Sequence, residues 1–123
     1  MMQQNKYFDY LEDFLNSSLQ SHTHLHIDLF CNAINDEGAL CLGSALANCI
    51  NLQNLILDLG SNKLGANGAS GLGSALASCT NLSNLTLYLS HNQIGVNGVQ
   101  GLGSGLENCN NLTNLKLYLR GYQ

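Results

Sequence analysis

The strongest constraint in this 123-residue sequence is a 30-residue unit that occurs three times in succession. The segments LGSALANC, LGSALASC and LGSGLENC are nearly identical and end at Cys49, Cys79 and Cys109. A unit of this size cannot bury its own apolar face, so tandem units are stable only when they stack on one another. The repeat therefore predicts a curved ribbon of similar layers.

Each unit has two halves with different periodicities. In the first half Leu55, Leu57 and Leu59 alternate with mostly polar residues, which indicates a strand with one buried face. In the second half, over residues 68–78, apolar residues recur at three- and four-residue spacing, which is typical of a short amphipathic helix. We expect one strand and one helix per unit, with the strands inside the curve and the helices outside.

The positions of the leucines and of one asparagine resemble the leucine-rich repeats of the ribonuclease-inhibitor type. That repeat reads Leu-x-x-Leu-x-Leu-x-x-Asn-x-Leu and continues into a helix. Its second half is matched by Leu57, Leu59, Asn62 and Leu64, and in the next unit by Leu87, Leu89, Asn92 and Ile94. Its first leucine is replaced by Asn54 or Asn84. The resemblance implies an α/β leucine-rich-repeat solenoid, with a curved parallel sheet inside and helices outside, that acts as a binding scaffold.

Three asparagines, Asn32, Asn62 and Asn92, share one position of the repeat. A column of side-chain amides can donate to and accept from the backbone of adjacent turns, whose N–H and C=O groups would otherwise lack partners. We therefore predict a structural ladder at these positions rather than a ligand site.

The segments outside the repeat predict how the solenoid is covered. The apolar residues of YFDYLEDFLNSSLQ fall on one helical face: Tyr7, Phe8, Leu11, Phe14, Leu15 and Leu19. We expect residues 1–21 to form an N-terminal capping helix and residues 22–123 to form three 30-residue repeats plus the first strand of a fourth. The last strand pattern, over residues 112–119, is expected to remain uncapped by a helix.

Composition narrows the class of partner. Four Lys and Arg residues against eight Asp and Glu residues give a formal net charge of −4, which argues against a general nucleic-acid binder. The apolar runs are far shorter than the roughly 20 residues of a membrane span, and the start MMQQNKYFDY lacks the apolar core of a signal peptide. These features indicate a cytosolic or nuclear location, and we expect a cytoplasmic protein that does not contact a membrane.

Candidate reactive groups have simpler structural interpretations. Three cysteines end equivalent helices and are expected to be core thiols. His24, His26 and Asp28 would share a strand face, and imidazole and carboxylate groups can bind a transition metal. The segment lacks the ligand spacing of a Cys-x-x-Cys or His-Glu-x-x-His motif, so we favour a solvent-exposed strand. The glycine-rich GASGLGSAL lacks the Gly-Lys-Ser/Thr ending of a phosphate loop. We expect no catalytic site, metal or cofactor.

The strand residues between the buried leucines would line the concave sheet in columns. One column reads Asp28, Asp58, Tyr88, Tyr118, and Arg120 follows two residues after its last member. Tyrosines beside arginine suit an interface anchor, and two aspartates suit a basic partner. We predict partner binding at these five residues; the alternative is a solvated face whose residues vary because no packing constrains them.

Two functions are consistent with these patterns. The first is a non-catalytic protein–protein interaction module that binds another protein through its concave strand face. The alternative is a structural subunit of a larger assembly, packed through its uncapped C-terminal edge, where Leu115, Leu117 and Leu119 would favour self-association or docking.

Overall fold

Five parallel strands form one sheet, in which they follow each other in sequence order. The computed structural model describes residues 5–121. The strands are β1 (Asn5–Phe8), β2 (His24–Asp28), β3 (Asn54–Asp58), β4 (Asn84–Tyr88) and β5 (Asn114–Tyr118). Leu25 pairs with Leu55, and Leu55 with Leu85, so β2, β3 and β4 are offset from one another by one repeat. The expected parallel sheet of the solenoid is confirmed.

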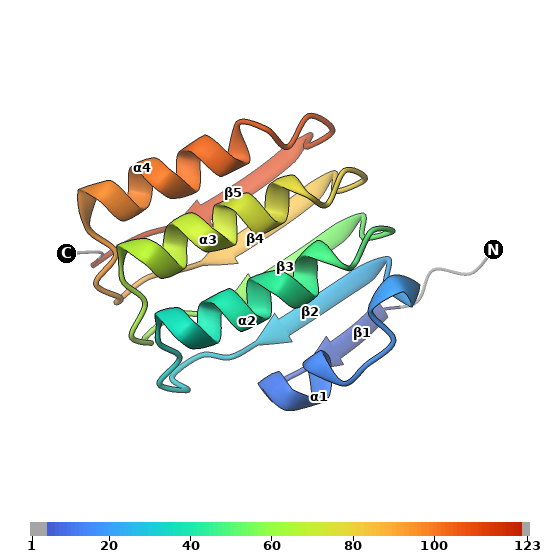
Figure 1. Cartoon of the computed structure of the whole chain (residues 1–123), viewed down its shortest axis with the longest axis horizontal. Coiled ribbons are helices and arrows are strands. Elements are labelled where there is room, and N and C mark those ends of the chain that lie inside the picture. Colours follow the sequence, from blue (N-terminus) through green and yellow to red (C-terminus); the bar gives the residue numbers. More distant parts are fainter. Residues whose placement is uncertain (1–4, 122–123) are drawn as a thin grey trace.

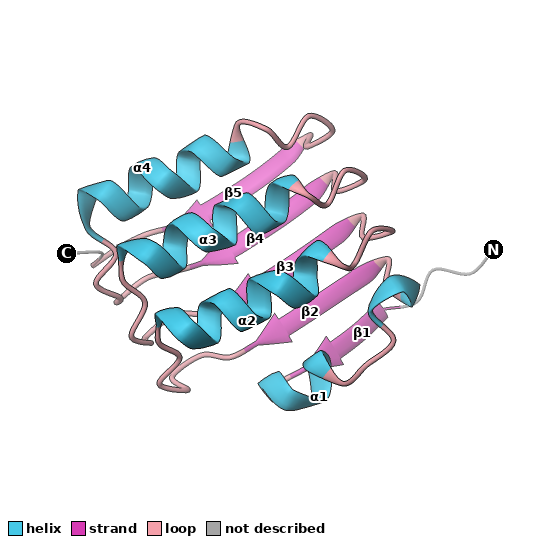
Figure 2. Cartoon of the chain, viewed as in Figure 1, coloured by secondary structure: helices cyan, strands magenta, loops and turns pink. Residues whose placement is uncertain are grey.

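Three long helices alternate with the strands and cover one face of this sheet (Figures 1 and 2). They are α2 (Asp36–Ala47), α3 (Ala66–Ala77) and α4 (Gly95–Leu106). The side chain of Asn35 caps α2 by accepting a hydrogen bond of 2.9 Å from the Gly38 N–H. Asp36, in the first turn of α2, accepts a bond of 2.7 Å from the Gly65 N–H, which joins the start of α2 to that of α3.

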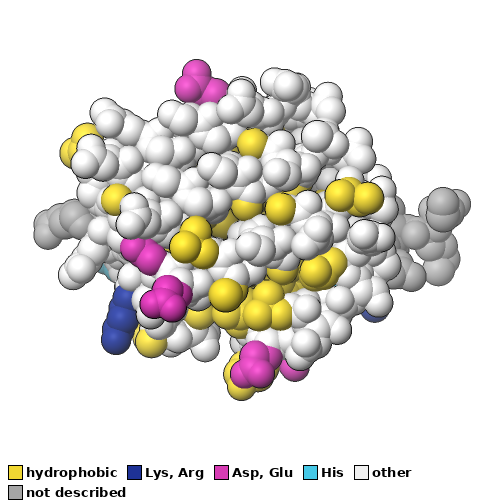
Figure 3. Space-filling model, viewed as in Figure 1, with side chains coloured by type: hydrophobic (Ala, Val, Ile, Leu, Met, Phe, Trp, Pro, Cys, Tyr) yellow, Lys and Arg dark blue, Asp and Glu magenta, His cyan; other side chains and the backbone are white. Residues whose placement is uncertain are grey.

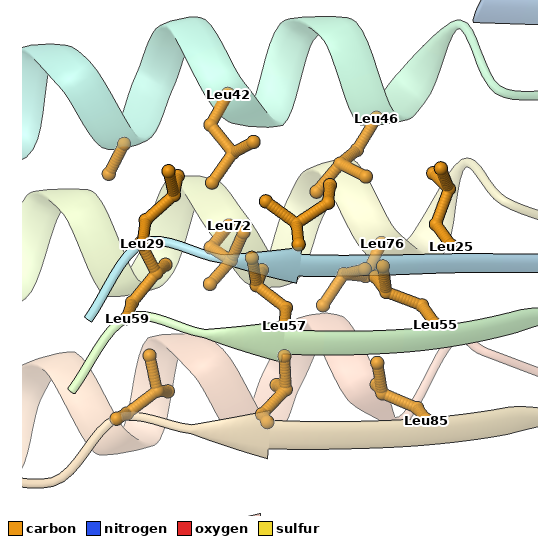
Figure 4. Packing of buried hydrophobic residues seen from close by; sticks show 14 of the residues in the cluster. Leu25, Leu29, Leu42, Leu46, Leu55, Leu57, Leu59, Leu72, Leu76 and Leu85 are labelled. Carbon is orange, nitrogen blue, oxygen red and sulfur yellow. The ribbon is translucent and has the colours of Figure 1, made fainter. Parts of the chain in front are cut away.

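The hydrophobic core lies between the sheet and the helices (Figure 4). Strand leucines such as Leu57 and helix leucines such as Leu42 and Leu72 are fully buried. Burying one leucine side chain contributes roughly 1.5–3 kcal/mol, so the repeated columns supply most of the favourable free energy of folding. The inward-facing side chains predicted from the alternating pattern are confirmed from β2 to β4.

Close packing between α3 and α4 requires glycine. A Cβ atom on Gly73 would lie 2.9 Å from the carbonyl oxygen of Leu102, and one on Gly105 would overlap the backbone of Gly73. Larger side chains would therefore push α3 and α4 apart.

The predicted asparagine ladder is confirmed at Asn62 and Asn92, two of its three positions. The Asn62 Nδ2 group donates to the carbonyl oxygens of Leu29 and Leu59, both at 2.9 Å. Its Oδ1 atom accepts from the backbone N–H groups of Asn32 and Ile34, at 2.9 and 2.8 Å. One side chain thus satisfies backbone groups of two successive repeats.

Asn92 repeats this arrangement one layer further on, and its side chain is only 4% exposed. It donates to Leu59 and Leu89 carbonyls at 2.9 and 3.1 Å and accepts from the Leu64 N–H at 3.0 Å. Asn32 is exposed, and its Nδ2 group donates to the Phe30 carbonyl of its own turn at 3.0 Å. The bridge between layers is therefore made by Asn62 and Asn92.

The N-terminal segment differs from the single capping helix expected for residues 1–21. Its described residues form strand β1, a five-residue helix α1 (Leu11–Leu15) and a short 3-10 helix (Leu19–Ser21). The reason is that β2 would otherwise expose a row of backbone N–H and C=O groups, which β1 pairs by lying parallel to it. Residues 1–4 of the expected helix lie outside the described residues, and the division of the chain at residue 21 stays a prediction.

The apolar residues of this segment nevertheless cover the first repeat. Phe14 is completely buried in the core. His22 is 3% exposed and packs against the Phe8 and Phe14 rings, and its Nε2 atom lies 2.9 Å from the Ser17 hydroxyl oxygen. Burial, and to a lesser extent the charge of Lys6, lowers the pKa of His22.

If this segment caps the first repeat, substitutions of two of its aromatic residues should differ greatly in their effect on the stability of the protein. Phe14→Ala should lower the free energy of unfolding by about 3–5 kcal/mol, because it leaves a cavity beneath the cap. Tyr10→Ala, at a position 54% exposed, should change it by less than about 0.5 kcal/mol. Urea denaturation of the two variants measures the difference, and equal midpoints would show that the segment does not stabilise the first repeat.

The ladder predicts a similar contrast between two asparagines at one repeat position. Asn92→Ala should cost about 2–4 kcal/mol, because it leaves a buried N–H and buried carbonyl groups without partners. Asn32→Ala, at the exposed end, should cost less than about 0.5 kcal/mol. Thermal unfolding followed by circular dichroism compares the two; a tolerant Asn92 would argue against a structural ladder.

Candidate functional site

The face of the sheet opposite the helices carries the strand residues that alternate with the buried leucines; we call it the open face. Strand pairing arranges its side chains in three rows that run across the strands. The first row contains Asn54, Asn84 and Asn114; the second contains His26, Ile56, Thr86 and Lys116; the third contains Asp28, Asp58, Tyr88 and Tyr118.

The third row brings together four of the five residues predicted to bind a partner. Tyr88 and Tyr118 stack with ring centroids 4.7 Å apart and an angle of 6° between the ring planes. They remain 37% and 45% exposed. Arg120 is exposed in the turn after β5, two residues beyond Tyr118. The stacked rings therefore form an exposed aromatic surface on the open face.

The two aspartates of this row also shape the chain. The Asp28 Oδ1 atom accepts from the Phe30 N–H at 3.1 Å, and Asp58 Oδ1 accepts from the Gly60 N–H at 2.9 Å. These bonds fix the turn that follows each strand. Each bond uses one carboxylate oxygen, so the aspartates combine a structural contact with a negative charge at the surface.

Two adjoining hollows lie over the first and second rows, and the sequence interpretation missed them. Their volumes are about 280 and 330 Å³, and both are lined by Asn54 and Ile56. Ile56 is 39% exposed and gives the open face an apolar centre. The signal was present in the sequence, because Asn54 and Asn84 stand where the family repeat has its first leucine.

The amides of the first row are linked to each other. The Nδ2 group of Asn84 donates to Oδ1 of Asn54 at 2.9 Å, and that of Asn114 donates to Oδ1 of Asn84 at 2.6 Å. This row places a line of oriented amides along the second hollow. Amides beside an apolar centre are suited to contact the backbone and one side chain of a peptide.

The histidines considered as metal ligands are engaged in other contacts. Nδ1 of His24 lies 3.0 Å from the Thr23 hydroxyl oxygen, and the His26 ring packs edge-on against Tyr7 with centroids 5.0 Å apart. Across residues 5–121, no three His, Cys, Asp or Glu side chains come together as a metal site would require.

The cysteines lie where the repeat predicts. Cys49 and Cys79 are buried, and burial is the main cause that raises the pKa of their thiols to about 12 and about 11. The Cys79 thiol donates to the Leu46 carbonyl at 3.2 Å. The prediction of core thiols is confirmed for these two residues, while Cys109 is half-buried.

In the described part of the chain, no helix is long and apolar enough to cross a membrane.

Comparison with protein families gives one match that agrees with this architecture. A model described as Leucine Rich repeat matches residues 21–43, 51–73 and 81–103, which together make up more than half of the chain. Comparison with curated proteins gives no significant match. Repeats of this kind generally mediate protein–protein interactions. The chain belongs to the leucine-rich repeat family.

Proposed function

We propose that this chain is a non-catalytic protein-interaction module of the ribonuclease-inhibitor-like type that binds another protein through the open face of its sheet. The observation that carries this proposal is the stacked and exposed pair Tyr88 and Tyr118. Tyrosine loses little conformational entropy on binding and supplies a large contact area, which makes it a frequent anchor of interfaces. Asp28, Asp58 and Arg120 supply charges on either side of this anchor.

The other features of the open face favour a protein over a membrane or a nucleic acid. Two carboxylates in the third row would repel phosphate groups, whereas the adjoining hollow at Asn54 and Ile56 offers amide and apolar contacts. The five cysteines are free thiols, which fits a reducing compartment such as the cytoplasm.

The helix side is the rival surface. It carries apolar side chains mainly over α2 and between α2 and the N-terminal segment (Figure 3). Leu40, on α2, is 46% exposed. The test of the proposed function must therefore compare the two sides of the molecule.

The proposed function predicts which substitutions weaken binding. Affinity capture followed by mass spectrometry identifies a partner, and calorimetry then measures its affinity for each variant. Tyr88→Ala and Asp58→Asn should each weaken binding by about 1–3 kcal/mol. Asparagine retains the oxygen that accepts from the Gly60 N–H, so Asp58→Asn removes charge without removing the turn bond. Ser74→Arg, at an exposed position of α3, is the control and should leave the affinity unchanged. The opposite pattern would place the interface on the helices.

A second candidate, a structural subunit packed through the β5 edge, is supported by the exposure of Leu115. This leucine is 44% exposed, whereas Leu25, Leu55 and Leu85 at the same repeat position are 3%, 1% and 2% exposed. Leu117 and Leu119 are half-buried. An apolar strand at the edge of a sheet favours self-association or docking of another chain.

This second candidate predicts concentration-dependent self-association. The weight-average sedimentation coefficient should rise with protein concentration, because a second copy would cover the leucines of β5. Leu115→Asp should abolish the rise without unfolding the chain, since the side chain is already 44% exposed. A sedimentation coefficient that is independent of concentration would contradict self-association at this edge.

A further inference from the structure

We infer that the protein segment bound by the open face presents an arginine side chain, which Asp58 binds between the rings of Phe30 and Tyr88. This inference rests on the proposed function and names the chemistry of the partner. It is carried by the surroundings of Asp58, which combine one carboxylate with an aromatic ring on each side.

The first ring is that of Phe30, which approaches Asp58 across Gly60. A Cβ atom on Gly60 would lie 3.1 Å from Oδ1 of Asp58 and 3.2 Å from Cδ1 of Phe30. The carboxylate and the edge of the ring therefore both border the position that glycine leaves free. Phe30 is 54% exposed, so much of its ring still faces solvent.

The second ring is that of Tyr88, the direct strand neighbour of Asp58. On its β5 side Tyr88 is covered by the stacked ring of Tyr118. On its β3 side the neighbour is Asp58, whose side chain ends at the carboxylate and is much shorter than a tyrosine. Neighbouring strands lie about 4.8 Å apart, close to the spacing of stacked planar groups. A planar group above Asp58 would therefore continue the Tyr118–Tyr88 stack.

Arginine has the properties that this position requires. Its guanidinium is planar and positively charged, stacks on aromatic faces and donates hydrogen bonds to carboxylates. Asp58 Oδ1 already accepts from the Gly60 N–H, which leaves Oδ2 to accept from the ligand. Lysine would satisfy the charge but could not extend the stack, because its ammonium group has no plane.

The negative charge of the third row is confined to β2 and β3. Asp28 pairs with Asp58 across these strands, whereas Lys116 on β5 and Arg120 after β5 lie on the far side of β4 from Asp58. The hollow at Asn54 and Ile56 begins earlier on the same strand, so a segment lying in it can reach Asp58 with one long side chain. The site therefore suits an arginine carried by an extended segment.

The experiment uses a phage-displayed library of random dodecapeptides, selected on the full chain at low salt. We expect the enriched peptides to contain arginine. For the best peptide, replacement of that arginine by citrulline, which is planar but neutral, should weaken binding at least about tenfold. Asp58→Asn and Tyr88→Leu in the protein should each weaken it by about tenfold as well.

Matched variants separate the site from general effects. Glu107→Gln removes one negative charge at an exposed position at the end of α4, and Tyr10→Leu removes one exposed tyrosine from the N-terminal segment. Both should leave the affinity within about twofold of the parent. Circular dichroism checks that the variants of Asp58 and Tyr88 remain folded, so a weaker affinity reports on the contact.

Three outcomes would overturn the inference. In the first, enriched peptides need Tyr88 for binding and yet contain no arginine, or bind equally well when lysine or citrulline replaces the arginine. Either result would contradict arginine recognition but would still support binding at the open face. Peptides whose affinity is unchanged by Asp58→Asn and Tyr88→Leu would bind at another surface, which would contradict both arginine recognition and the proposed function. A library that yields no binder would also count against both.

Discussion

The repeat region depends on the constant offset of 30 residues between neighbouring strands from β2 to β5. This register places leucine or isoleucine beside leucine in every buried column and brings each ladder asparagine next to the turn of the preceding repeat. Asn62 and Asn92 would lose their bonds to Leu29 and Leu59 if the register slipped by one residue, and the leucines would turn to the other face. The buried amides therefore fix the same alignment that the hydrophobic core requires.

The same register also organises the surface. Because strand residues alternate between faces, every buried column has an exposed row beside it, and the row inherits its geometry without contributing to the core. The spacing of Tyr88 and Tyr118, with centroids 4.7 Å apart, follows the distance between adjacent strands. Stacking of these rings is thus a consequence of placing the same residue at the same position in two neighbouring repeats.

Repetition explains which features could be predicted from the sequence. The strands, the three long helices, the buried leucines and the roles of Asn62 and Asn92 all recur, so each copy supports the interpretation of the others. The N-terminal segment has no second copy, and Tyr7, Phe8 and Phe14 fit a helical face as well as a strand followed by a short helix. Pairing of β1 with the β2 edge is a contact between distant residues, which helical periodicity does not reveal. The approach of Phe30 to Asp58 depends on the turn around Gly60 and was equally hidden.

The third row shows how a regular repeat can contain one position whose surroundings differ from those of its equivalents in the other repeats. Its residues are aspartate in β2 and β3 and tyrosine in β4 and β5, so the row changes from acidic to aromatic between Asp58 and Tyr88. The aspartates hold the turns after their strands, whereas the tyrosines stack. Either residue is compatible with the fold, because neither enters the core. Only at this junction is a carboxylate the strand neighbour of an aromatic ring in the row, and the asymmetry of the open face therefore arises from one change of residue type within an otherwise regular array.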